Sequence, residues 1–264
     1  MKELTFALIF SAFAFGSEQD VTIYIDENYS PFSYKTNGQA VGLYADILNT
    51  AFSRMKSFNV KLVPIPWKRG KKIMEQGKGF GLTPAYFHGH DWPYLYPYSF
   101  PFYTETVITI CQSSVLEKPK NNWPYDYLGL KIGNVAGYDG WGGTVFRQLV
   151  AQRKIKYEET KGVRDSVIQL IVRNFDCIIM EGRAFDYVYG GLKDHKYGTT
   201  LLKKGAVVGK DSVYIGYSKP AIEGGKYPYY MKFMQAFDSA IYKMRKSGEI
   251  KKIMSRSNHL VNKK

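Results

Sequence analysis

The stretch Thr104-Glu-Thr-Val-Ile-Thr-Ile-Cys-Gln112 decides how the rest of the chain is interpreted. It is rich in β-branched residues and alternates between two sets of side chains, which is typical of a β-strand. One α/β unit precedes it, and a second begins at Leu130. A similar extended segment, Ser212-Val-Tyr-Ile-Gly-Tyr-Ser-Lys-Pro220, follows the second unit. If both segments cross between two lobes, they form a two-strand hinge beside a ligand cleft; otherwise they are ordinary strands of one domain.

Hydrophobic periodicity predicts the elements of both units. In the first unit it predicts strands at residues 21–25, 59–63 and 80–86, with helices at 42–55 and after Pro66. In the second unit it predicts strands at 130–135, 157–160 and 175–180. It also predicts one helix capped by Asp139 and a second helix at 163–171. Strands that alternate with helices imply a parallel sheet with helical crossovers. Near the carboxyl end, one apolar helical stripe is predicted from Tyr230, Met234, Phe237, Ile241 and Met244.

Composition excludes several classes of function. The chain has 264 residues, 45% of them hydrophobic, which is enough for a large core. Its net charge of +14 comes from scattered lysines without a recognition motif, so we expect no nucleic-acid partner. His88 and His90 lack a third ligand, so they indicate a solvated loop and no metal site. Cys111 and Cys177 allow one disulfide, but nothing in the sequence brings them together, so we expect two buried thiols.

The first residues resemble a secretory signal peptide, predicted over residues 1–16. An apolar run from Leu4 to Phe15 follows Lys2, and Ala14-Phe15-Gly16 fits a cleavage site. The run is too short to span a membrane. We therefore expect a mature protein exported to the periplasm.

An ordered set of short motifs resembles the bacterial extracellular solute-binding proteins of family 3, the periplasmic receptors for polar amino acids. The first lobe's signatures are matched by Asp26-x-x-Tyr29-x-Pro31-Phe32, Gly42-Leu-Tyr-Ala-Asp46, Trp67, Gly77-Lys-Gly-Phe80 and Ser99-Phe-Pro-Phe-Tyr103. Later signatures are matched by Asn174-Phe-Asp176 and Ser247-Gly-Glu249. The resemblance covers nearly the whole mature chain.

The resemblance implies an α/β, two-lobed fold of the periplasmic-binding-protein type II, with two crossing strands and a cleft between the lobes. It places the first lobe at residues 17–110 plus 217–264 and the second at 111–216. It further implies a monomer that closes on a small polar ligand, amino-acid-like or a cationic amine, without catalysis or a cofactor. Its partner would be an ABC permease or a membrane sensor.

The sequence departs from the family pattern at one position. In the family, a Thr-x-x-Arg stands seven residues before the Ser that matches Ser99, and its Arg binds the ligand's α-carboxylate. Here Trp92 takes the place of that Arg and Gly89 that of the Thr, and no Arg occurs between Arg69 and Arg147. Indole cannot replace a bidentate guanidinium. The departure argues against an ordinary amino-acid ligand.

Acids and aromatics at family cleft positions suggest a cationic ligand instead. The resemblance places three acids in the cleft: Asp26, Asp139 and Glu181. Flat walls are expected from Tyr29, Phe32, Trp67, Tyr86, Trp92 and Tyr138. Acids with aromatic walls suit an ammonium group through ion pairing and cation–π contact. In the alternative interpretation, Asp139 only caps a helix, Glu181 pairs with Arg183, and Phe32 and Tyr86 pack in the core.

Two other functions remain open from the sequence. Some relatives of this fold are periplasmic dehydratases, but the chain has no Ser/His/Asp or Cys/His arrangement. Carboxylates alone could still act as acid and base. A degenerate protein that kept the fold and lost its ligand would also explain the missing Arg.

Overall fold

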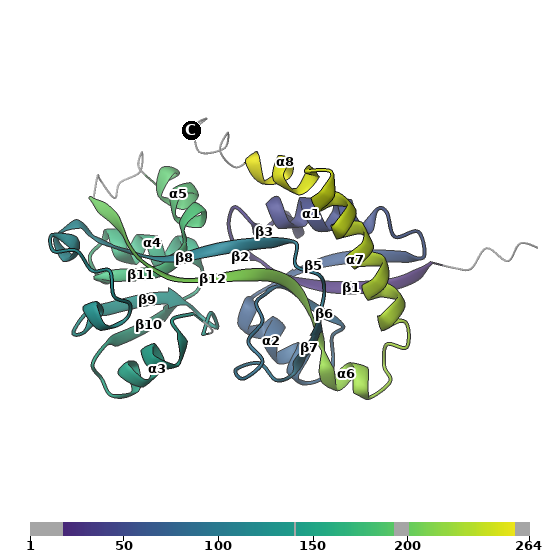
Figure 1. Cartoon of the computed structure of the whole chain (residues 1–264), viewed down its shortest axis with the longest axis horizontal. Coiled ribbons are helices and arrows are strands. Elements are labelled where there is room, and N and C mark those ends of the chain that lie inside the picture. The colour runs from purple at the N-terminus through teal and green to yellow at the C-terminus, as the bar shows by residue number, and fades with distance from the viewer. Residues whose placement is uncertain (1–17, 140, 193–200, 257–264) are drawn as a thin grey trace, which may run out of the picture.

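The protein consists of two groups of elements that two long strands connect. The computed structural model describes residues 18–139, 141–192 and 201–256, so the predicted signal peptide lies outside the described residues. Strands β8 (Tyr103–Gln112) and β12 (Leu202–Ser218) run from one group to the other (Figure 1). They contain the two segments from which the hinge was predicted. One sheet passes through both groups in the order β10-β9-β11-β8-β12-β6-β1-β5, and β7 pairs with β12.

The first lobe is built on parallel strands at one end of this sheet. Strand β1 pairs with both β5 and β6 in parallel, as the strand–helix pattern predicted. Its main strands are β1 (Gln19–Asp26), β5 (Phe58–Ile65), β6 (Gly81–Ala85) and β7 (Leu95–Tyr98). A small separate sheet consists of β2 (Asn28–Tyr29), β3 (Ser33–Thr36) and β4 (Gln39–Val41). The helices are α1 (Leu43–Phe52), α2 (Trp67–Glu75), α6 (Lys219–Glu223), α7 (Tyr230–Lys246) and α8 (Glu249–Ser255).

The second lobe repeats the parallel arrangement at the other end of the sheet. Strand β9 pairs in parallel with β10 and β11, while β11 pairs with β8 in the antiparallel direction. Its strands are β9 (Lys131–Val135), β10 (Lys156–Thr160) and β11 (Cys177–Glu181). Its helices are α3 (Gly143–Ala151), α4 (Val163–Ile171) and α5 (Gly182–Gly190), with short 3₁₀ turns at Ser113–Leu116 and Tyr125–Tyr127. Helix α3 begins after Gly142 without a side-chain cap, so the predicted cap by Asp139 is wrong.

Helix α7 buries a stripe whose centre differs from the predicted one. Phe237, Ile241 and Met244 are fully buried as predicted, and the other buried positions are Phe233 and Ala240. Tyr230 and Met234 are only partly buried at the edge of the core. The helix has 17 residues, and across the described ranges no helix combines the length and apolar character that a membrane span requires.

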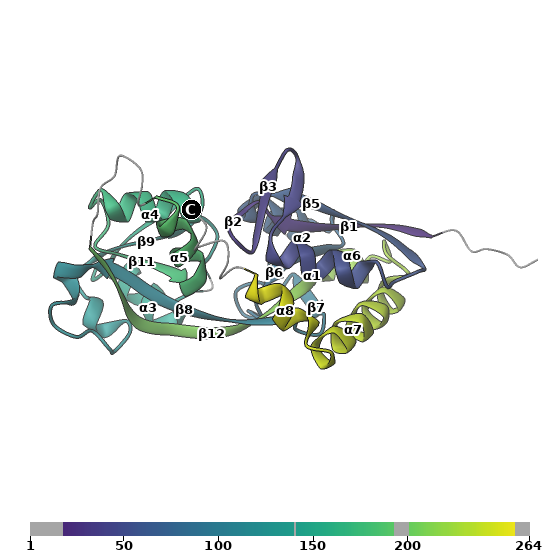
Figure 2. The same ribbon diagram turned by 90° about the horizontal axis from the view of Figure 1, so that it is seen from above.

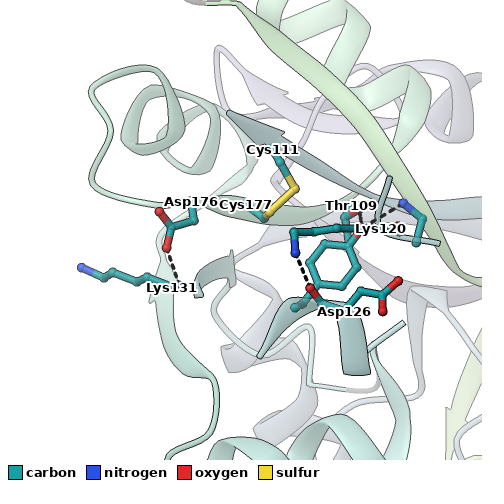
Figure 3. Close-up of a disulfide and its surroundings, with 9 residues drawn as sticks. Thr109, Cys111, Lys120, Asp126, Lys131, Asp176 and Cys177 are labelled. Atoms are coloured by element: carbon teal, nitrogen blue, oxygen red, sulfur yellow. Dashed lines mark hydrogen bonds between the residues drawn. A yellow bond between two sulfur atoms is a disulfide. The ribbon is translucent and has the colours of Figure 1, made fainter. Parts of the chain in front are cut away.

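A disulfide joins Cys111 of β8 to Cys177 of β11 (Figure 3), so the expectation of two free thiols is wrong. The two residues stand directly opposite each other in the antiparallel ladder, where side chains on one face are neighbours. Because 66 positions separate them in the chain, only the strand pairing brings them together. Close to the bridge, the Asp176 carboxylate accepts a hydrogen bond from the Lys131 amide and secures the start of β9.

Candidate functional site

The candidate site lies between the lobes, where loops leave the carboxyl ends of parallel strands β1, β6 and β9. In open α/β sheets this edge is where ligands bind, because the loops there converge on one crevice. The two views in Figures 1 and 2 show that β8 and β12 bound this space along one side. One small cavity there is lined by Asp26, Tyr29, Trp67, Pro84, Tyr86, Trp92, Tyr138 and Trp141.

A second small cavity adjoins the first and reaches further into the second lobe. It is lined by Tyr29, Val135, Tyr138, Trp141, Val163, Ile179, Met180 and Glu181. Each cavity has a volume of about 10 Å³, which is about the space that one water needs. Aromatic rings therefore fill most of the site in this arrangement of the lobes. A ligand larger than water needs those rings to move or the lobes to separate.

Glu105, on the hinge strand β8, is the most deeply buried acid of the site. It is fully buried and accepts hydrogen bonds from the hydroxyls of three first-lobe tyrosines, Tyr29, Tyr44 and Tyr86. Burial, together with the nearby Glu181 carboxylate, raises the pKa of Glu105 to about 8, although the three hydrogen bonds act in the opposite direction. At neutral pH this carboxyl therefore holds a proton in the folded protein.

Asp26 connects the two lobes through a single hydrogen bond. Its Oδ2 accepts from the Tyr138 hydroxyl at 2.5 Å, and its Oδ1 accepts from the Asn28 amide at 2.9 Å. Burial raises the pKa of Asp26 to about 6, while these two hydrogen bonds oppose the shift. Because Asp26 belongs to the first lobe and Tyr138 to the second, the contact forms only when the lobes are close.

Two indoles and one lysine hold the rim of the site closed. Trp67 Nε1 donates to the Gly137 carbonyl at 3.1 Å. Trp92 Nε1 donates to Asp139 Oδ1 at 3.2 Å, and Lys71 Nζ contacts the two oxygens of the same carboxylate at 2.7 and 2.9 Å. Lys71 also lies 5.1 Å from the centre of the Trp92 ring. The charge of Asp139 is thus compensated by Lys71 from the opposite lobe.

Further ion pairs connect the lobes outside this rim. Arg147 of α3 lies 2.8 Å from Asp91. Lys68 of α2 lies 3.8 Å from Glu159 of β10, and the Lys68 ammonium is largely exposed. Exposed pairs of this kind contribute little each, so the buried contacts of Asp26 and Trp67 dominate the closed arrangement.

Glu181 points at the start of helix α5. Its Oε2 accepts hydrogen bonds from the amides of Arg183 and Ala184 at 2.6 and 3.0 Å, so the residue caps the helix. Burial raises the pKa of Glu181, and the two amides and the Arg183 guanidinium oppose that shift. Glu181 also lines the second cavity, so the same residue caps α5 and faces the site.

The structure brings most of the predicted site residues together. Six of them line the first cavity: Asp26, Tyr29, Trp67, Tyr86, Trp92 and Tyr138. Phe32 does not line either cavity; it is fully buried behind Tyr29, with ring centres 5.0 Å apart, and stacks on Tyr44 at 4.7 Å. Asp139 stands exposed at the rim.

Several residues of the site escaped the sequence analysis: Tyr44, Lys71, Pro84, Glu105 and Trp141. Glu105 had a detectable signal, because it shares the alternation phase of Val107 and Thr109, which face the core. An acid on the buried face of a strand is rarely accidental. Trp141 follows a glycine-rich turn, and nothing in its local pattern indicates that its ring lies 5.1 Å from that of Tyr86.

The His88 to Asp91 loop is exposed at Gly89, His90 and Asp91, as predicted, and only His88 departs from that prediction. His88 is partly buried, and its ring lies 4.7 Å from that of Trp92. Burial lowers the pKa of His88, so the ring is neutral at pH 7. No group of three or more metal-binding side chains occurs among the residues that the structure describes.

Comparison with known proteins identifies the fold. No protein-family model matches the chain, and no curated protein does so either. Solved structures do match over nearly their full lengths. A mutant of ArgBP from T. maritima is 14% identical, with 91% of this chain and 95% of that chain covered and a TM-score of 0.68.

Two further structures agree with this match. The arginine-, lysine-, histidine-binding protein ArtJ from Geobacillus stearothermophilus is 17% identical, with 90% and 94% covered and a TM-score of 0.66. A histidine kinase sensor domain with similarity to periplasmic binding proteins is 13% identical, with 90% and 96% covered and a TM-score of 0.69. The chain therefore has the two-lobed, type II fold of the periplasmic binding proteins.

Proposed function

We propose that this chain is a periplasmic solute-binding protein whose lobes close on a small cationic amine. The observation that carries the proposal is a pair of buried carboxyls, Asp26 and Glu181, that line an interlobe site walled by aromatic rings. A third buried carboxyl, Glu105, accepts hydrogen bonds from Tyr29 and Tyr86 of that wall. The similarity in fold to amino-acid-binding proteins supports a binding role rather than catalysis. It also supports delivery to an ABC importer or to a membrane sensor.

The raised pKa values of the three carboxyls indicate that the site lacks a positive charge beside them. Burial is the largest cause of the shift at each of the three carboxyls. A cation placed among them would favour their ionised forms and lower those pKa values, because an opposite charge within a few ångströms stabilises a carboxylate. The surrounding indole and phenol rings would add cation–π attraction. An ammonium group satisfies both requirements.

A zwitterionic amino acid fits the same site poorly. Its carboxylate would need a cation, and the residues that line the two cavities include neither Arg nor Lys. Lys71, at the rim, already binds Asp139. Burying an unpaired carboxylate beside three acids is strongly unfavourable. The charge of the site therefore selects against ligands with an anionic group.

Calorimetric titration with methylamine, propylamine, putrescine, choline and zwitterionic amino acids tests the proposal. We expect heat from at least one amine and none from the amino acids. Asp26→Asn and Glu181→Gln should each weaken the best amine at least about tenfold, since hydrogen bonds to charged groups contribute roughly 1.5–3 kcal/mol. Glu223→Gln, which removes an exposed acid on α6, is the matched control and should leave the affinity unchanged.

Two results would contradict the amine assignment. The first is tight binding of an unmodified zwitterionic amino acid, and the second is an amine affinity that neither cleft substitution changes. NMR of the recovered amine after long incubation separates binding from catalysis, because a binding protein returns its ligand unaltered.

A further inference from the structure

A third cavity, larger than the two of the interlobe site, lies on the side where α5 of the second lobe approaches α8 of the first (Figures 1 and 2). It is an open groove with a volume of about 470 Å³. Phe102 and the beginning of β8, Tyr103 and Thr104, contribute to its wall, and α8 contributes Ile250 and Met254. Its size is within the range of small-molecule sites, in contrast to the two closed cavities.

Three cations line this groove, and no carboxylate is among its lining residues. They are Arg183 at the start of α5, Arg245 at the end of α7, and Lys251 in α8. Within the described part of the chain, none of the three forms an ion pair with an acid. Positive charge therefore collects on this concave surface, although the Glu181 carboxylate is close enough to Arg183 to offset part of it.

Each guanidinium is positioned by an aromatic ring rather than by an acid. The Arg183 guanidinium lies 5.9 Å from the centre of the Tyr103 ring. The Arg245 guanidinium lies 5.3 Å from the centre of the Phe100 ring, and its Nη1 donates to the Pro101 carbonyl at 3.1 Å. A guanidinium has five N–H donors, so both side chains are oriented while donors stay available to a ligand.

We propose that this groove is a second binding site, for a small amphipathic oxyanion with a carboxylate or phosphate head and a short apolar body. The planar forks of Arg183 and Arg245 match such a head, since guanidinium binds carboxylate and phosphate through paired N–H donors. The partly exposed ring of Tyr103 supplies apolar surface for the body, and the almost wholly buried Phe102, Ile250 and Met254 form the apolar floor of the groove. The charge is opposite to that of the interlobe site, so the two sites take ligands of opposite sign.

A ligand in the groove would contact both lobes at once. Arg183 belongs to the second lobe, whereas Arg245 and Lys251 belong to the first. An anion that binds Arg183 and Arg245 together stabilises the closed arrangement of this structure, because it can contact both arginines only when α5 and α8 are close to each other. A ligand in the groove would therefore shift the equilibrium between open and closed lobes toward the closed form, although it binds outside the interlobe site.

Calorimetry on the full chain at low ionic strength tests the site with phenyl phosphate as the probe. We expect saturable binding that weakens with added salt, as exposed charges are screened. Comparing the affinities for benzoate and phenyl phosphate shows whether the groove prefers a carboxylate or a phosphate. The affinity for inorganic phosphate measures the contribution of the anionic head without the apolar body. Benzylamine has the same ring with the opposite charge and should not bind the groove.

Substitutions locate the probe. Arg183→Gln and Arg245→Gln should each reduce the affinity for phenyl phosphate at least about tenfold. Lys252→Gln removes a neighbouring exposed cation of α8 that does not line the groove, and it should have no effect. Asp26→Asn, in the interlobe site, should also leave the affinity for phenyl phosphate unchanged. Unaltered melting curves of the variants without probe would show that they fold.

Three results would overturn the proposal: no saturable binding of either aromatic anion, equal affinity of the wild type and both arginine variants, or loss of binding in Asp26→Asn alone. The last would place the anion in the cleft. These results are independent of the amine titrations, since the two sites share no lining residue.

Discussion

Replacing Glu105 by Gln should remove a large part of the pH dependence of stability. The pKa of Glu105 rises from its ordinary value of 4.5 to about 8 in the folded protein, with burial as the main cause. Between these values the folded chain holds a proton that the unfolded chain has released. Stability is therefore fully present below pH 4.5 and falls as the pH rises through about 8.

The size of the stability loss follows from the difference between the pKa values of Glu105 in the unfolded and the folded chain. Each pH unit corresponds to about 1.4 kcal/mol at 25 °C, so the wild type should lose about 5 kcal/mol between pH 4.5 and pH 8 through this group alone. Gln has the shape of the protonated acid and cannot ionise. Glu105→Gln should match the wild type at pH 5 to within about 1 kcal/mol and exceed it by several kcal/mol at pH 9.

Urea unfolding at pH 5, 7 and 9 measures the effect. The wild type and Glu105→Gln are compared at each pH from the midpoint and slope of the transition, with Glu223→Gln as an exposed-acid control. If the stabilities of wild type and Glu105→Gln stay parallel from pH 5 to pH 9, Glu105 is ionised in the folded protein. The description of a protonated, tyrosine-bound carboxyl would then be refuted.

Three further perturbations test other parts of the structure. Replacing Cys111 and Cys177 by Ala should lower the free energy of unfolding by about 4 kcal/mol, because the bridge closes a loop of 66 positions, and chemical denaturation measures the loss. Tyr138→Phe removes the hydroxyl that bonds Asp26, so the pKa of Asp26 should rise above about 6, which carboxyl-carbon NMR would detect. Trp92→Phe removes an indole that lines the cleft, so it should diminish the intrinsic fluorescence change that an amine ligand produces; an undiminished change would exclude that ring from the ligand's surroundings.

Local pattern was sufficient to predict the main alternating strands and helices of both lobes and the crossing segments, but not the small β2–β4 sheet, β7, α5, α6 or α8. Period-2 alternation identified most of β8, because its β-branched residues are contiguous in the chain. Only residues 212–218 of β12 were predicted, since its first half carries exposed Lys203, Lys204 and Lys210 and resembles a solvated loop. That half is a strand because β8 is already beside it, and such pairing is non-local.

The centre of the site could not be predicted for the same reason. The hydroxyls around Glu105 come from Tyr86, Tyr44 and Tyr29, which lie 19, 61 and 76 positions away in the chain. Family resemblance placed Tyr29 near the cleft, and Tyr86 was inferred to lie there because it flanks the missing Arg, but neither gave a reason to place an acid on β8 among them. Only the folded arrangement reveals which phenols share one carboxyl.

The disulfide also decides where the hinge can flex. It fastens the end of β8 to β11, and the ladder between these strands extends back as far as Val107. The stretch from Val107 to Cys111 therefore swings with the second lobe as part of a stiff plate. Residues 103–106 lie ahead of that ladder, and there Glu105 accepts hydrogen bonds from three tyrosines of the first lobe. Strand β8 is thus attached to the second lobe from Val107 onward and to the first lobe at Glu105, so β8 can accommodate a movement of the lobes only between these two attachments or by breaking one of them.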